Sequence, residues 1–314
     1  MSKEHLNSNL NVPLWRDYLE LCKPNVVALM ALTTIVGMFL SVPGMVPLNV
    51  LFIGNIGIGL SAASAAVINH VVDKKIDLLM DRTEQRPIAQ GRVKDKHALF
   101  FSAVMGSLGI FLLVYFINSL TAWLTLGSLI GYALIYTCFL KRATPQNIVI
   151  GGLAGAAPPL LGWTAVTNEI HGYPLLLVLI IFAWTPPHFW ALALHRKEDY
   201  KKASIPMLPI THGDRYTRLH ILLYTIILFG VSLLPFATKM FGPLYLIGAI
   251  CLGVGFLYWA IQLMLNKNDD APMQTFKYSI IYLMVLFLIM LIDHYLYPAA
   301  IRLETSIPME IQNF

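Results

Sequence analysis

The chain has 314 residues, of which 57% are hydrophobic and only 12% are charged, and its mean hydropathy is +0.66. A soluble domain carries about a quarter charged residues, so this composition excludes an ordinary soluble protein and predicts one embedded in a membrane. The formal net charge of +5 is explained by basic loops on the cytoplasmic side, and we expect no nucleic-acid partner. The three cysteines lie far apart, which argues against a disulfide framework or a zinc site.

The N-terminal segment, 1–24, contains six charged side chains and no apolar run of signal-peptide length, so we expect no cleaved export signal. Nine apolar runs of spanning length follow within 25–298, and a tail, 299–314, ends the chain. The runs are continuous rather than alternating, which favours helices over barrel strands. The predicted fold class is an all-α integral membrane protein. The expected spans are 25–43, 51–72, 97–117, 120–140, 147–167, 174–194, 219–238, 242–265 and 278–298.

The basic residues set the expected orientation, because cytoplasmic loops carry an excess of Lys and Arg. With nine spans, twenty of the 22 Lys and Arg residues fall on one side of the membrane, and only Lys239 and Arg302 fall on the other. The N-terminus is therefore predicted to be cytoplasmic and the C-terminus external. Loops on the external side are very short, such as Asn118 and Ser119, so chemistry is expected at the cytoplasmic face.

A row of oxygen-bearing side chains ends the second expected span. Asn69, Asp73 and Asp77, here called the oxygen row, follow one another at four-residue intervals. On an α-helix each such step advances about 6 Å and turns by only about 40°, so all three share one face. Three explanations compete: a helix end frayed in water with its carboxylates paired to Lys74 or Arg82, a transporter's ion site, or a site for Mg²⁺, which binds carboxylates together with substrate phosphates.

The residues after the oxygen row favour the divalent cation. Arg82 and Arg86 follow within one or two turns of the last carboxylate, and arginine forks match the geometry of phosphate oxygens. Carboxylates that hold a metal, a metal that holds a diphosphate, and arginines that neutralise the remaining charge form a leaving-group site for a diphosphate ester. We therefore predict Mg²⁺ on the oxygen row and a diphosphate beside it.

The pattern Asn-x-x-x-Asp-x-x-x-Asp at the end of a second membrane helix, followed by Arg-Thr-x-x-Arg-Pro, resembles the first signature of the UbiA-type intramembrane prenyltransferases. This resemblance implies nine transmembrane helices around a central cavity, with a polyprenyl diphosphate held by Mg²⁺ between two aspartate-bearing motifs on the cytoplasmic side. The likeness extends from about Leu21 through the ninth span. Further matching stretches are 21–24, 136–142, 151–159, 184–194, 199–200 and 205–209.

Within this family the stretches 188–190 and 205–209 are most similar to the branch that farnesylates heme. The resemblance implies transfer of a farnesyl group from farnesyl diphosphate to a vinyl group of heme b, with addition of water, to give heme O for respiratory oxidases. It also implies that Mg²⁺, Arg82, Arg86, Lys141 and Arg142 neutralise the diphosphate. The predicted catalytic residues are Asn69, Asp73, Asp77, Arg82, Arg86, Lys141 and Asp199.

The second acidic motif departs from the family pattern. The family usually carries a second Asp-x-x-x-Asp, but the corresponding segment, 195–200, has only Glu198 and Asp199 as acidic residues. Two arrangements stay open. Either a single ion is held mainly by the oxygen row, or a second ion is held in addition by Asp199 and water.

The predicted heme contacts are His188, Trp190 and His195. Aromatic residues beside His188 could contact a flat macrocycle, but such residues are also common interfacial anchors. A membrane histidine often serves only as an interhelical hydrogen-bonding group. Axial ligation of iron by His188 is therefore one hypothesis, and a purely structural histidine is the other.

Two other functions stay open from the sequence. One is prenylation of an aromatic acid that serves as a quinone precursor, within the same family. The other is a secondary transporter, which predicts acidic or interrupted helices at mid-membrane in matching halves, whereas Asp293 is the only acid well inside a late span. Without a transit-like leader, a bacterial inner membrane is the expected location. The expected partners are the lipid bilayer, both substrates, and a heme-modifying enzyme or terminal oxidase that receives the product.

Overall fold

The structure is a computed structural model that describes residues 14–265 and 270–297, apart from the side chain of Arg142. Within these ranges every regular element is a helix. Two segments, η1 and η2, wind as wider π-helices. The elements are α1 (Trp15–Leu21), α2 (Pro24–Leu40), η1 (Val50–Gly54), α3 (Asn55–Asp77), α4 (Asp95–Phe116), α5 (Ser119–Ile130), η2 (Gly131–Leu140), α6 (Lys141–Ala143), α7 (Asn147–Ala156), α8 (Pro158–Thr167), α9 (Gly172–His195), α10 (Lys197–Lys202), α11 (Leu208–Thr211), α12 (Gly213–Ala237), α13 (Pro243–Leu265) and α14 (Ala271–Leu296).

The helices confirm the predicted membrane architecture. Within the described residues, eight helical segments are long and apolar enough to cross a bilayer. The pair α1 and α2, bent by 53° at the break between them, passes the same test together and brings the number to nine. Each of the nine predicted runs falls on one of these segments, and the fifth, 147–167, has the same bounds as α7 and α8 taken together.

Some helices extend beyond the predicted runs. Helix α3 continues to Asp77, α12 begins at Gly213 and α14 begins at Ala271, each several residues outside the apolar stretch. Hydropathy marks the part of a helix at bilayer depth, whereas backbone hydrogen bonding continues into polar sequence beyond it. The extension of α3 matters most, because it places the whole oxygen row on regular helix.

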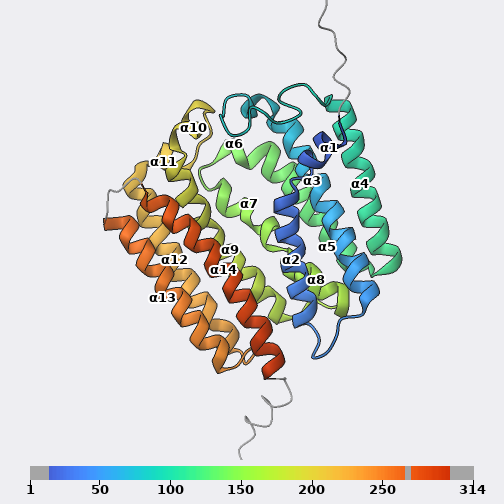
Figure 1. Ribbon diagram of the computed structural model, residues 1–314, viewed down its shortest axis with the longest axis vertical. Coiled ribbons are helices and arrows are strands. Elements are labelled where there is room, and N and C mark those ends of the chain that lie inside the picture. Colours follow the sequence, from blue (N-terminus) through green and yellow to red (C-terminus); the bar gives the residue numbers. More distant parts are fainter. Residues whose placement is uncertain (1–13, 266–269, 298–314) are drawn as a thin grey trace, which may run out of the picture.

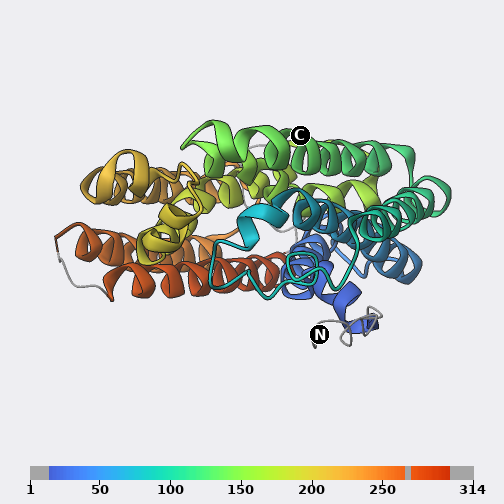
Figure 2. The same cartoon turned by 90° about the horizontal axis from the view of Figure 1, so that it is seen from above.

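Long polar segments gather at one end of the helical bundle. The connection between α3 and α4 lies at this end together with α1, α6 and α10, whereas the C-terminal end of α14 lies at the opposite end (Figure 1). Figure 2 shows the chain passing around the bundle from the blue N-terminal helices through the green middle to the red α14. Contacts between α14 and α2 close this circuit.

Close backbone contact joins α2 to α8. A Cβ atom on Gly37 would collide with the carbonyl group of Pro159, and one on Gly162 would collide with the carbonyl oxygen of Thr34. Small residues allow membrane helices to approach in this way. The contact fixes α2, and with it the residues that precede this helix at the polar end.

Asp293 has a structural role. Its carboxylate is fully buried and accepts hydrogen bonds from the backbone N–H groups of Gly242 (2.6 Å) and Tyr245 (3.0 Å). These groups belong to the first turn of α13, whose orphan donors and dipole favour a carboxylate. The one acid well inside a late span is therefore a helix cap supplied by a neighbouring helix, which accounts for it without ion transport.

Candidate active site

The oxygen row lies on one face of α3, as predicted, and it is buried. Asn69, Asp73 and Asp77 are 4%, 0% and 3% exposed, and the Asn69 amide donates to Asp73 Oδ2 at 2.7 Å. These residues are regular helix. The frayed-end explanation is therefore wrong, because a frayed end would expose the carboxylates to water.

Two cations from other segments bind the two carboxylates. Lys141, the first residue of α6, donates to Asp73 Oδ2 at 2.5 Å. Arg86 Nη1 lies 2.8 and 2.9 Å from the two carboxylate oxygens of Asp77. Lys74, one of the partners expected for a frayed end, instead forms a surface ion pair with Asp95. The structure thus brings together five of the predicted residues: Asn69, Asp73, Asp77, Arg86 and Lys141.

Lys23 joins this cluster, and the sequence analysis missed its role. Its ammonium donates to Asn69 Oδ1 at 2.5 Å, and its backbone has the left-handed φ of 49° at the break before α2. The sequence pattern that could have indicated this role is a single basic residue directly before the proline that begins an apolar span.

The π-helix η2 supplies a further buried polar group. Thr137 is fully buried, donates to the carbonyl of Tyr132 five residues earlier and accepts from the Asn69 amide at 3.5 Å. Such wide turns are frequent at functional sites. Here η2 ends immediately before Lys141, so its winding sets the position from which that ammonium reaches the oxygen row.

His70 is a second residue that the sequence analysis left without a role. Its imidazole is 2% exposed, and neither ring nitrogen has a hydrogen-bond partner in the described part of the chain. Lys23, Arg86 and Lys141 lie close enough to interact with it electrostatically. The end of α3 therefore contains more buried polar groups than its own hydrogen bonds satisfy.

The donor set fits a divalent cation. Asp73 Oδ1 is buried and has no hydrogen-bond partner among the described residues. No three His, Cys, Asp or Glu side chains within residues 14–265 and 270–297 gather as a metal cluster. Two carboxylates and an amide suit Mg²⁺, which keeps several waters and takes substrate phosphate oxygens as further ligands.

Arg82 and Asp199 lie around the cluster rather than in it. Arg82 is exposed, and its guanidinium donates to the Tyr200 hydroxyl at 3.3 Å and lies 5.6 Å from the centre of that ring. This contact holds α10 beside the connection between α3 and α4. Asp199 pairs with Arg196 at 3.6 Å. The side chain of Arg142 lies outside the described part of the structure.

His188 lies in an aromatic sandwich between α9 and α14. Its ring stacks on Trp184, with the centroids 4.1 Å apart, and on Phe276 at 4.5 Å. Its Nδ1 lies 2.7 Å from the hydroxyl of Ser279. Both faces of the imidazole are therefore covered, so His188 can meet another molecule only through its ring edge.

The other two predicted heme contacts lie elsewhere on α9. Trp190 is fully buried and packs edge-on against His220 and Tyr224 of α12, so contact with a porphyrin would require the indole to leave this packing. His195 is exposed at the last residue of the helix. It is seven residues, or about 10 Å of helix rise, from His188.

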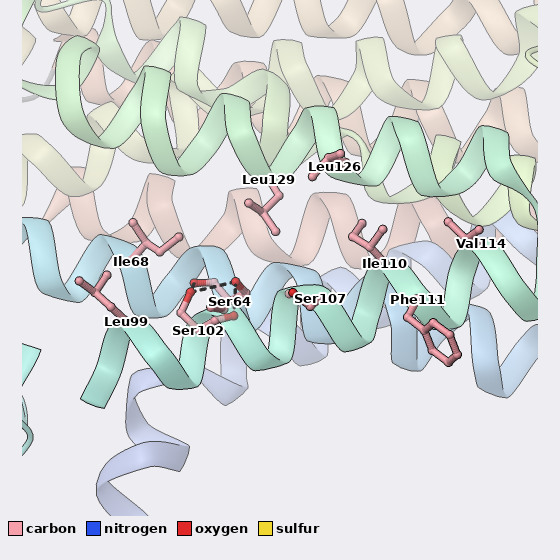
Figure 3. A pocket seen from close by; sticks show the side chains of 12 residues that line it. Ser64, Ile68, Leu99, Ser102, Ser107, Ile110, Phe111, Val114, Leu126 and Leu129 are labelled. Carbon is pink, nitrogen blue, oxygen red and sulfur yellow. Dashed lines mark hydrogen bonds between the residues drawn. The ribbon is translucent and has the colours of Figure 1, made fainter. Parts of the chain in front are cut away.

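An apolar groove of about 660 Å³ lies on the flank formed by α3, α4 and α5. Figure 3 shows its lining, with a hydrogen-bonded pair, Ser64 and Ser102, between Leu99 and Ser107. None of its lining residues is charged or belongs to the oxygen row. The groove therefore offers no charged side chain for binding a diphosphate.

Comparison with known proteins places the chain. The model of the UbiA prenyltransferase family matches residues 30–295. The chain belongs to the UbiA prenyltransferase family. Among curated relatives it is 64% identical over 301 residues to the protoheme IX farnesyltransferase of Saccharophagus degradans, covering 96% of this chain and 99% of that protein. It is 63% identical to the protein of the same name from Marinobacter nauticus, covering 91% and 95%.

Solved structures of other proteins share the fold. A structure described as digeranylgeranylglyceryl phosphate synthase matches with a TM-score of 0.76 at 22% identity, over 89% of this chain and 98% of that chain. A UbiA homolog from Archaeoglobus fulgidus, solved with bound DMAPP and Mg²⁺, matches with a TM-score of 0.61 at 15% identity, over 87% and 99%. The all-helical fold implied by the resemblance is thereby confirmed.

Proposed function

We propose that this UbiA-family chain transfers the farnesyl group of farnesyl diphosphate to a vinyl group of heme b and forms heme O. The observation that carries the proposal is the 64% identity, over nearly the whole length of both chains, to a protoheme IX farnesyltransferase. The buried cluster of carboxylates and cations at the end of α3 supports the diphosphate half of the reaction. Prenylation of a quinone-precursor acid has no comparable support.

The oxygen row is proposed to hold a divalent cation, taken to be Mg²⁺. Support comes from Asp73 Oδ1, which has no hydrogen-bond partner within residues 14–265 and 270–297, and from the A. fulgidus homolog solved with DMAPP and Mg²⁺. Such an ion would help to neutralise the departing diphosphate. We propose that Asp199, whose carboxylate lies 3.6 Å from Arg196, would hold a second ion through water.

The surrounding cations are proposed to bind the diphosphate. Arg86 and Lys141 already lie at the carboxylates, and we place Arg82 and Arg142 among the further diphosphate-binding residues. Fixed positive charge at the point where negative charge develops lowers the barrier to ionisation. The Lys23 ammonium lies in the same cluster and adds one more such group.

The reaction then follows from the chemistry of an allylic ester. The bond between C1 of the farnesyl group and oxygen breaks, and diphosphate leaves with the electron pair. The allylic cation forms a carbon–carbon bond with the heme vinyl group, and water captures the new cation and releases a proton. An apolar multi-span enclosure suits both substrates and limits early hydrolysis of the allylic cation.

On the porphyrin side, we propose that His188 contacts heme b through its ring edge. Support comes from the covered ring faces and from Nε2, which makes no hydrogen bond among the described residues. Trp190 and His195 remain weaker candidates, because one is packed against α12 and the other lies at the end of α9.

The proposed location is a bacterial inner membrane, with the site at the cytoplasmic face. The polar connections that carry most basic residues lie at the same end of the bundle as the oxygen row (Figure 1), which is the distribution expected for cytoplasmic loops. The product would pass to a second heme-modifying enzyme or to a terminal oxidase.

The test is to incubate membranes containing the chain with farnesyl diphosphate and either heme b or a hydroxybenzoate, and to analyse the extracted products. Conversion of heme b to heme O is expected, with no prenylated benzoate. Membranes containing the Asp77→Ala variant at equal abundance serve as the control. Prenylated benzoate with unchanged heme b would refute the proposed acceptor, and normal turnover by the variant would refute the role of the oxygen row.

A further inference from the structure

The hydrogen-bond network between α9 and α14 determines more than the position of His188. Trp184 and His188 are one turn apart on α9, and Phe276 and Ser279 are one turn apart on α14. The Trp184 indole donates to the backbone carbonyl of Ser279 at 2.7 Å. The Ser279 hydroxyl contacts both His188 Nδ1 at 2.7 Å and the carbonyl oxygen of Phe276 at 2.6 Å.

The Ser279 hydroxyl can donate to only one of these two short contacts, because it carries a single proton. The Phe276 carbonyl can only accept, so the hydroxyl proton of Ser279 must lie on the line to that oxygen if the 2.6 Å contact is a hydrogen bond. The serine oxygen then acts as an acceptor toward His188, and Nδ1 carries the imidazole proton. In the opposite assignment, the hydroxyl would donate its proton to His188 Nδ1. The Ser279 hydroxyl oxygen and the Phe276 carbonyl oxygen would then lie 2.6 Å apart with no proton between them.

A neutral imidazole has one protonated and one unprotonated nitrogen. With the proton on Nδ1, the lone pair is on Nε2. Nε2 is the one polar atom of this ring without a hydrogen bond within the described residues. Because Trp184 and Phe276 cover the two ring faces, neither rotation of the ring nor stacking of a ligand is open to His188.

We infer that Ser279 is a positioning residue for heme binding, and that it fixes His188 with its Nε2 lone pair ready to coordinate the iron of the heme substrate. Histidines that bind a metal through one nitrogen are commonly held by a hydrogen bond from the other. The inference rests on the proposed contact between His188 and heme b. Ser279 itself does not touch the porphyrin; it acts through the histidine.

Ser279→Ala isolates this effect, because the Trp184 bond goes to the backbone carbonyl of residue 279 and survives the change. Ser279→Thr is the matched control, since it keeps the hydroxyl. The set is completed by His188→Ala and by the double variant with alanine at both positions. Each full-length protein is purified and titrated with ferric heme b. The Soret band and the dissociation constant are recorded. Thermal unfolding checks that each protein is folded.

His188→Ala is expected to abolish the Soret feature of histidine ligation. Ser279→Ala should weaken heme binding by about 10- to 100-fold, the usual effect of losing such a partner, and Ser279→Thr should restore it. In the His188→Ala background, Ser279→Ala should add nothing. Wild-type affinity and spectrum in folded Ser279→Ala, or an equal further loss in the double variant, would overturn the inference.

The same preparations distinguish this inference from the proposed function. If His188→Ala leaves the heme spectrum and affinity unchanged, the inference fails with the proposed heme contact, whereas conversion of heme b to heme O by the wild-type chain would still support the transferase. If the wild-type chain forms no heme O, the proposed function fails, whatever the spectra show.

Discussion

Asp73→Asn is expected to lower kcat about 1,000-fold while leaving heme affinity unchanged. Asp73 is fully buried and accepts a hydrogen bond from Lys141 at 2.5 Å, and its Oδ1 has no partner in the described part of the chain. The substitution keeps the shape of the side chain and removes its charge. It should therefore disable the oxygen row without opening a cavity in α3.

The magnitude follows from the charges around the site. Two carboxylates face the side chains of Lys23, Arg86 and Lys141, and the substitution leaves one carboxylate among these groups. A unit charge at about 4 Å contributes on the order of 4 kcal/mol at an effective dielectric constant of about 20. At about 1.4 kcal/mol for each tenfold change in rate, losing one unit-charge interaction of this size corresponds to roughly 1,000-fold.

The assay measures heme O formation at saturating heme b over a range of Mg²⁺ and farnesyl diphosphate concentrations. Binding of farnesyl diphosphate without a divalent cation should not weaken, because the variant site is more positive. Asp95→Asn is the matched control, since Asp95 belongs to an exposed pair with Lys74, and such pairs contribute about 0–1 kcal/mol. A kcat for Asp73→Asn within tenfold of the wild type at saturating Mg²⁺ would refute the reasoning.

Three further results are expected. Arg86→Ala should raise the KM for farnesyl diphosphate more than tenfold without changing the heme dissociation constant. It removes both hydrogen bonds to Asp77 and a cation proposed to bind the diphosphate. Equal effects on both substrates would contradict this prediction. Asp293→Ala should destabilise the protein by about 3 kcal/mol, from two lost hydrogen bonds to a charged group, measured as a lower unfolding temperature in detergent. Gly162→Ala should cost about 1–3 kcal/mol through overpacking, because its methyl group meets α2. Gly127→Ala, where the added atom meets no described residue within 4 Å, should not destabilise. Equal unfolding temperatures for the two glycine variants would argue against tight packing of α2 on α8.

The sequence predicted the membrane spans well because bilayer thickness fixes their length. An apolar run of about 20 residues has few alternatives to a spanning helix. The predicted bounds of the fifth run, 147–167, agree with the structure to the residue. The oxygen row could equally be predicted from the sequence, because residues spaced four apart on a helix lie on the same face. Both predictions use information that is local in the chain.

Partners from distant segments could not be read in this way. Lys23 is 46 positions from Asn69, and Lys141 is 68 positions from Asp73, so each pair forms only when α2 and η2 pack beside α3. The same holds for His188, whose stacking on Phe276 and bond to Ser279 depend on the contact of α9 with α14. Composition shows that such residues are rare in spans but does not say which of them meet.

Pairing explains how so much charge can be buried at the end of α3 before any substrate arrives. An isolated carboxylate in a low-dielectric site would be very costly, yet Asp73 and Asp77 are each met by a cation from another segment. A bound diphosphate with its cation would bring both signs of charge, and Lys141 and Arg86 would then be able to turn to phosphate oxygens while the cation neutralised the carboxylates. Each buried charge then keeps a partner through the exchange. Under the proposed function, Lys141 and Arg86 belong to the diphosphate site as much as the oxygen row does, and a variant that removes either should mainly affect the use of farnesyl diphosphate.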